Sequence, residues 1–131
     1  MNSIRQESTT AIPFEKFEKA VMEKLLEKET SINKVLREQY KNASVVSRKF
    51  TGVGFFTDFN VPKNIPPVME PVAYGYGNVS CIINGIENCG FVLFIKEGVM
   101  ICLEGYTFMD KWPEVITSYH LEESNPKIII I

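Results

Sequence analysis

The residues best suited to chemistry in this 131-residue chain are a carboxylate and several aromatic side chains around position 104. Glu104 is followed by Tyr106, Asp110 and Trp112, and Asp58 ends a glycine-containing segment that we expect to lie beside them. A carboxylate framed by aromatic rings is typical of a general acid or base, or of a pocket for a polar ligand. A structural role explains the same residues more simply. In that role the carboxylate accepts backbone N–H groups and Trp112 caps the edge of a sheet.

Two glycines begin a second pattern of interest. Gly52 and Gly54 resemble the start of a dinucleotide-binding motif, but Thr57 stands where the third glycine belongs. The residues after it do not begin a helix, which a phosphate site of this kind requires. We therefore interpret the glycines as marking a bend, a bulge or the close approach of another backbone.

Cysteine and histidine chemistry has little support in the sequence. Cys81, Cys89 and Cys102 form no CxxC pair, and their odd number fits reduced thiols in a cytoplasm. We expect Cys102 to be a small buried hydrophobe, and Cys89 to be more accessible because it lies beside a turn. His120 is the only histidine, and no HxxxH or CxxC spacing predicts a zinc site. We expect no catalytic residues, no cofactor and no metal.

Composition narrows the class of protein further. Fourteen basic and 16 acidic residues are well mixed and give a net charge of −2, so nucleic acid is not an expected partner. No apolar run approaches the ~18 residues of a membrane span, and the N-terminus lacks the apolar segment of a signal peptide. We expect a cytoplasmic protein with one domain, in which residues 1–12 are flexible, 13–42 are helical and 45–131 are β-rich.

The helical part follows a clear apolar period. After Pro13, residues Phe14, Phe17, Val21 and Leu25 recur at the spacing of one helical face. The charged residues between them are expected on the opposite, polar face: Glu15, Lys16, Glu18, Lys19, Glu23, Lys24, Glu27 and Lys28. Thr30 and Ser31 then predict a break and a new N-cap. A second helix ends near Asn42, and the two helices form either a hairpin or one bent rod.

The β-rich part is organised around an apolar run, residues 91–95, which we expect to be a central strand covered on both faces. Glu97 and Gly98 predict a hairpin turn after it. In the return strand, Val99, Ile101 and Leu103 alternate with Met100, Cys102 and Glu104. We expect the first three in the core with Phe91, Leu93 and Ile95. The expected fold class is α+β: one or two N-terminal helices packed on a mainly antiparallel sheet of four to six strands.

Turn and tail residues complete the expected sheet. Asn84 and Gly85 are a strong hairpin signal, although residues 88–90 compete as the corner. Lys127 precedes four isoleucines, and we expect residues 127–131 to form a paired strand, because a free apolar tail would aggregate. Such a strand also makes a homodimer plausible.

Three blocks of the sequence, TGVGFFT at 51–57, GFVLF at 90–94 and LEGYT at 103–107 with Trp112 and Pro113 downstream, resemble a family of small uncharacterised bacterial proteins. The resemblance covers about residues 50–114. It implies a bacterial, cytoplasmic origin and places the glycine segment and the Glu104–Trp112 region in one constellation. The family provides no activity to transfer.

We expect a non-catalytic protein that acts by protein–protein contact, with a toxin-neutralising immunity role as one form of this function. The alternative is a small-ligand binder or hydrolase with a pocket centred on Glu104. A deep pocket around Glu104 would favour the alternative, and a flat surface would favour the protein partner.

Overall fold

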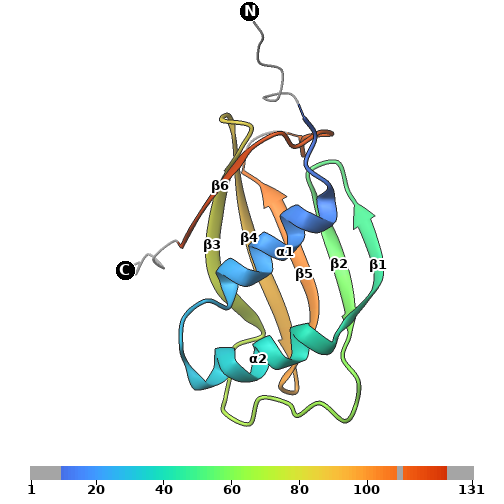
Figure 1. The fold of residues 1–131 in the computed structure, drawn as a ribbon, viewed down its shortest axis with the longest axis vertical. Helices are drawn as coiled ribbons and strands as arrows, with labels where there is room; N and C mark the ends of the chain where they lie inside the picture. Colours follow the sequence, from blue (N-terminus) through green and yellow to red (C-terminus); the bar gives the residue numbers. More distant parts are fainter. Residues whose placement is uncertain (1–9, 109–110, 124–131) are drawn as a thin grey trace, which may run out of the picture.

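Two helices pack against one face of a six-stranded antiparallel sheet in the computed structural model of the protein (Figure 1). The structure describes residues 10–108 and 111–123, so the expectations for residues 1–9 and for the 127–131 strand lie outside the described residues. The expected α+β class is confirmed. The strand order is β1-β2-β5-β4-β3-β6. The elements are α1 (Phe14–Leu25), α2 (Ser31–Asn42), β1 (Ser44–Phe50), β2 (Gly54–Asn60), β3 (Gly75–Ile83), β4 (Glu87–Lys96), β5 (Val99–Thr107) and β6 (Tyr119–Glu123).

The two helices are separate elements joined by a short turn, which resolves the alternative that the sequence left open. As expected, Thr30 is the N-cap of α2, where its side-chain oxygen accepts a hydrogen bond from the Asn33 amide at 3.0 Å. Arg37 of α2 donates to the carbonyl oxygen of Leu26 at 2.6 Å and to that of Lys28 at 3.2 Å. These bonds satisfy carbonyl groups that the end of α1 leaves without a helical partner.

The glycine-containing segment forms a hairpin of two strands, β1 and β2. The chain reverses at Gly52, whose φ of +91° favours glycine over residues with a Cβ atom. Gly54 then lies against β5, where a Cβ atom would come within 2.0 Å of the Gly105 carbonyl oxygen. The expectation of a bend and a close backbone approach is therefore confirmed.

The hairpin of β4 and β5 turns at Glu97 and Gly98, as expected, with φ angles of +53° and +80°. The Asn84–Gly85 hairpin between β3 and β4 is likewise confirmed, with φ angles of +56° and +74°. Two core assignments in β5 were wrong. Val99 and Ile101 are only half-buried, and Met100 takes the core position with no exposed surface. The cause is a shift in register between β4 and β5 near Met100, which reverses the alternation expected from the sequence.

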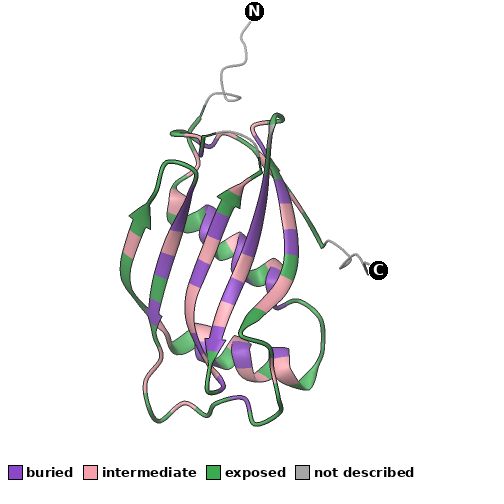
Figure 2. Cartoon of the chain, turned by 180° about the vertical axis from the view of Figure 1, so that it is seen from behind, coloured by how far each residue is buried: buried purple, intermediate pink, exposed green. Residues whose placement is uncertain are grey.

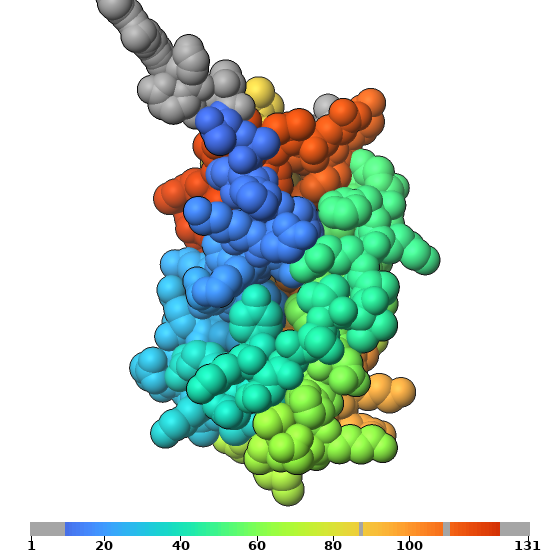
Figure 3. All heavy atoms as spheres, turned by 45° about the vertical axis from the view of Figure 1, so that its right-hand side comes forward, coloured from blue at the N-terminus to red at the C-terminus, as the bar shows by residue number. Residues whose placement is uncertain are grey.

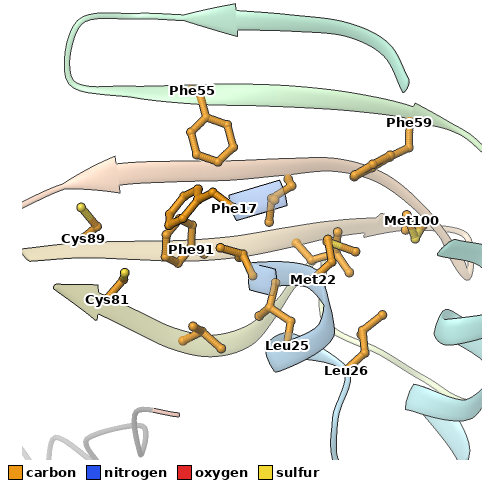
Figure 4. Close-up of a cluster of buried hydrophobic side chains, with 14 of the residues drawn as sticks. Phe17, Met22, Leu25, Leu26, Phe55, Phe59, Cys81, Cys89, Phe91 and Met100 are labelled. Atoms are coloured by element: carbon orange, nitrogen blue, oxygen red, sulfur yellow. The ribbon is translucent and has the colours of Figure 1, made fainter. Parts of the chain in front are cut away.

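The core lies between the helices and the sheet (Figure 4). Phe17 of α1 has no exposed surface, and its ring lies 5.8 Å from Phe91 of β4 and 6.2 Å from Trp112. Phe55 of β2 packs edge-to-face on the same indole at 5.1 Å. Phe91, Leu93, Ile95 and Leu103 are buried as expected.

The loop between β2 and β3 is held by one buried side chain, Gln39 of α2. Its amide nitrogen donates to the carbonyl oxygens of Pro66 at 3.2 Å and Gly98 at 2.8 Å. Its amide oxygen accepts from the Met100 backbone N–H at 2.9 Å. The side chain thereby fixes the loop and the β4–β5 turn to α2. Because all three bonds join parts of the fold to one another, we assign Gln39 a structural role.

Candidate functional site

The structure separates the residues that the sequence placed in one constellation. Glu104 and Tyr106 lie on the sheet face opposite the helices, and Asp58 joins them there from the neighbouring strand. Trp112 lies on the helix side, packed on Phe55 and the other core rings, with 9% of its surface exposed. Asp110 lies outside the described residues. Glu104 and Trp112 thus occupy opposite faces of the sheet.

We call the face opposite the helices the open face, because no helix lies in front of it (Figure 2). Its side chains fall into cross-strand rows set by the strand register. One row joins Phe56, Glu104 and Val92, and the next joins Asp58, Cys102 and Phe94. A third row places Tyr106 opposite Gly90, where the tyrosine ring occupies the space that a Cβ atom would need. Aromatic and carboxylate side chains therefore alternate over three central strands. The open face comprises Phe56, Asp58, Val92, Phe94, Cys102, Glu104 and Tyr106.

Burial against these neighbours changes the acid–base properties of the open face. It raises the pKa of the Glu104 carboxyl, for which the described residues provide no hydrogen bond or ion pair. The pKa of the Cys102 thiol rises to about 12, chiefly through burial and then through its hydrogen bond with Asp58. This thiol stays protonated at neutral pH and is a poor nucleophile.

The remaining cysteine and histidine candidates are dispersed. Cys89 has no exposed surface, so the expectation that its place beside a turn makes it accessible was wrong. It faces Cys81 across β3 and β4, inside the core, and burial raises the pKa of Cys81 to about 11. His120 lies on the outer strand β6, largely exposed, 3.0 Å from Glu122. Among the described residues, no group of three or more potential ligands is placed to hold a metal ion.

A second candidate site lies on the helix side, where a groove of about 720 Å³ separates α1 from α2 and β1 (Figure 3). A buried ion pair forms one end of it. Glu18 of α1 is 3% exposed and accepts two hydrogen bonds from Arg48 of β1, at 2.8 and 3.0 Å, and one from the Thr57 hydroxyl of β2. The hydrogen bonds with Glu18 raise the pKa of Arg48, and this charge-assisted pair joins the sheet to α1.

This ion pair is not among the predictions from the sequence, in which Glu18 lies on the polar face of the helix. That assignment was wrong. Glu18 lies four residues from both Phe14 and Met22, which places it on the buried stripe. The sequence contains one signal of the pair, a glutamate at a helix position where the spacing of apolar residues predicts a buried side chain. Its partners could not be identified from the sequence, since Arg48 and Thr57 are 30 and 39 residues away.

Comparisons with known proteins add no further assignment to these sites. No family model, no curated protein and no solved structure matches the chain. None of the helices in the described part of the chain is long and apolar enough to cross a membrane.

Proposed function

We propose that this protein is a non-catalytic binding protein whose open face contacts a partner protein with a basic, partly apolar surface. The observation that carries the proposal is the two-sided apolar character of β4. Phe91, Leu93 and Ile95 meet the helices, whereas Val92 and Phe94 point to the other face, where they are half-buried and no described helix covers them. A central strand of this composition normally has cover on both sides, and a partner would supply the missing cover.

The carboxylates of the open face indicate that the partner carries positive charge. Asp58 and Glu104 are next to the aromatic side chains of the open face, and the one cation in these rows, Lys49, pairs with Phe56 from the outer strand β1. An arginine side chain can bind a carboxylate and stack on an aromatic ring at once. A second copy of this chain, packed face to face, would instead bring the two pairs of carboxylates together. A basic partner therefore fits better than a homodimer through this face.

The same geometry argues against a reaction centred on Glu104. This side chain lies between Phe56 and Val92 in a cross-strand row of the sheet, and burial keeps the nearby Cys102 thiol protonated. A sheet face that extends over three strands suits another protein better than it suits a small substrate. An immunity-type role, with a basic toxin as the partner, is one form of this function.

Affinity capture followed by calorimetry tests the proposal. The immobilised parent protein is compared with Glu104→Lys, and proteins retained by the parent are purified and titrated individually. We expect at least one purified basic protein to bind the parent, and its affinity for Glu104→Lys to fall at least tenfold, since the change places a cation against a cation.

The matched control is Lys34→Glu, a change of equal size and opposite sign on an exposed position of α2. We expect this variant to bind as the parent does. A partner that binds Glu104→Lys and the parent equally, or that is lost only with Lys34→Glu, would place the interface elsewhere and overturn the proposal. Failure to purify any direct binder would count against it as well.

A further inference from the structure

A stripe of apolar side chains runs along the open face and past the end of β5. We call it the apolar stripe, and it comprises Phe56, Val92, Phe94, Tyr106 and Phe108. The rings of Tyr106 and Phe108 are 5.7 Å apart, which joins Phe108 to the rest of the stripe. These two side chains are 36% and 57% exposed, so they offer surface to another molecule. Partly exposed aromatic rings in contact with one another are typical of an interaction surface.

Polar side chains border the apolar stripe on both sides. On one side, β1 places Ser47 opposite Asp58 and Lys49 opposite Phe56. On the other side, β3 and β6 contribute mostly polar side chains, namely Ser80, His120 and Glu122, with Ile82 as the apolar residue among them. The stripe therefore extends over β2, β5 and β4, and the two spacings between these strands give it a width of about 10 Å.

This width favours one helix over a partner sheet or strand. A helix with its side chains is about 10–12 Å across, so one helix covers the stripe. A packed sheet would extend over the neighbouring strands as well, where Lys49 and Glu122 would lose contact with water. A single added strand cannot pair here, because β2, β5 and β4 already have hydrogen-bonded neighbours on both edges.

The two carboxylates of the open face are spaced for cations on successive turns of a helix. Asp58 pairs with Cys102, and Glu104 lies two residues further along β5, so the carboxylates belong to diagonal neighbours about 7–8 Å apart. Helix residues four positions apart have Cβ atoms about 5–6 Å apart, and long cationic side chains cover the difference. Among the described residues, Glu104 has no ion pair, and Asp58 bonds to the uncharged groups of Ser47 and Cys102. Both carboxylates therefore retain capacity for a cation.

The length of the stripe sets the length of this helix. Phe94 pairs with Cys102 at one end, and at the other end the Phe108 N–H donates to the Asn88 carbonyl oxygen at 3.1 Å. Positions 102 to 108 are three steps of two residues, about 20 Å along the strand direction. At the helical rise, about 14 residues span this distance.

We propose that the partner of the open face presents one amphipathic helix of about 14 residues, with two cationic side chains one turn apart. Its apolar side covers Val92, Phe94 and Tyr106, and its cations bind Asp58 and Glu104. This inference rests on the proposed function, because it names the part of the basic partner that makes the contact.

Calorimetric titration of the full chain with three synthetic peptides of about 14 residues tests the proposal. The first has arginines four positions apart and leucines at helical spacing on an alanine background. The second has the same composition in the alternating order of a strand, and the third has glutamate in place of arginine. We expect the first peptide to bind at least tenfold more tightly than either of the others, and to gain helical circular dichroism on binding. Amide NMR shifts of the protein should centre on Val92, Glu104 and Tyr106.

Two glutamine substitutions on the same face of the sheet give the matched comparison. Glu104→Gln removes a charge beside the apolar stripe, whereas Glu122→Gln removes one from β6, away from it. We expect Glu104→Gln to weaken binding of the first peptide about tenfold through the lost charge-assisted bond. Glu122→Gln should leave the affinity within about twofold of the parent value.

Equal binding of the first and second peptides, shifts centred outside β4 and β5, or no binding of the first peptide at millimolar concentration would each overturn the proposal. The affinity-capture test separates this failure from failure of the proposed function. A captured basic protein that depends on Glu104, while the helical peptide does not bind, would refute the helix and leave the proposed function intact. A captured protein that binds Glu104→Lys as well as it binds the parent would refute both.

Discussion

At the scale of single residues, the molecule contains two carboxylates in contrasting surroundings. Glu18 is buried, but Arg48 and Thr57 satisfy its oxygens. Glu104 is half-buried, and the described residues provide no partner for its charge. Satisfied polar groups stabilise a fold, whereas an unsatisfied charge costs stability unless a ligand or partner pairs with it. Glu18 therefore has a structural role, and Glu104 is the better candidate for contact with another molecule.

Replacing Arg48 with methionine tests the structural role of Glu18. The change keeps much of the side-chain volume but leaves the buried Glu18 carboxylate without its cation. Breaking a buried pair costs about 3–5 kcal/mol, and we expect about 2–3 kcal/mol here because a quarter of the Arg48 side chain is exposed. The free energy of unfolding is measured in urea. Adding Glu18→Gln to Arg48→Met should recover much of the loss, and a single variant as stable as the parent would contradict the interpretation.

Glu104→Gln tests the cost of the unpaired charge through its pH dependence. Burial raises the pKa of Glu104 in the folded protein above its ordinary value of 4.5. The folded state therefore holds this proton more tightly than the unfolded state, and stability falls as pH rises through the folded pKa. We expect the parent and Glu104→Gln to unfold equally at pH values below 4.5, and the variant to be the more stable near neutral pH. Urea midpoints across this range check the result. A difference that is constant with pH would contradict it.

At the scale of elements, local signals predicted the turns and helix ends, and contacts distant in sequence decided the rest. Asn84 and Gly85 adopt positive φ angles, which asparagine tolerates and which glycine adopts readily because it lacks a Cβ atom. Two residues of the sequence are therefore enough to predict this turn. The register shift beside Met100 depends on how β5 pairs with β4, so the alternation of β5 read alone gave the wrong core positions. The sequence predicted one site that contains Glu104 and Trp112. Their separation onto two faces of the sheet likewise depends on contacts that are distant in sequence. Trp112 follows β5 in the sequence but lies on the helix side, where it packs on the aromatic core.

A pair of alanine substitutions in β5 tests the register shift. Met100 has no exposed surface and Ile101 is half-buried. We expect Met100→Ala to lower the free energy of unfolding by about 2–5 kcal/mol, through lost burial and the cavity that remains. Ile101→Ala should cost less than half as much. Chemical denaturation of both variants decides between the two registers, since the sequence alternation alone predicts the reverse order.

At the scale of the whole molecule, the two faces of the sheet are covered to different extents. The helices close one face of the sheet, and Phe17, Phe55 and Leu93 are completely buried there. The open face keeps Phe94 and Tyr106 only partly covered, with the Tyr74 ring 4.9 Å from Phe94. Contiguous apolar surface on a monomer commonly marks an interaction site. The buried core thus lies on the helix side, and no described helix covers the opposite face.

Phe94→Ser and Leu93→Ser test this division with neighbouring residues of the same strand. Leu93 points to the core, so its replacement by a polar side chain should unfold the protein or lower the unfolding free energy by several kcal/mol, about 3 or more. Phe94 points to the open face, and its replacement should cost only about 1 kcal/mol. The parent should bind a neutral apolar fluorescent dye such as Nile red through this face, and folded Phe94→Ser should bind less. Equal dye fluorescence from the parent and Phe94→Ser, or a loss of stability as large as that of Leu93→Ser, would show that Phe94 belongs to a closed core and that the open face is covered.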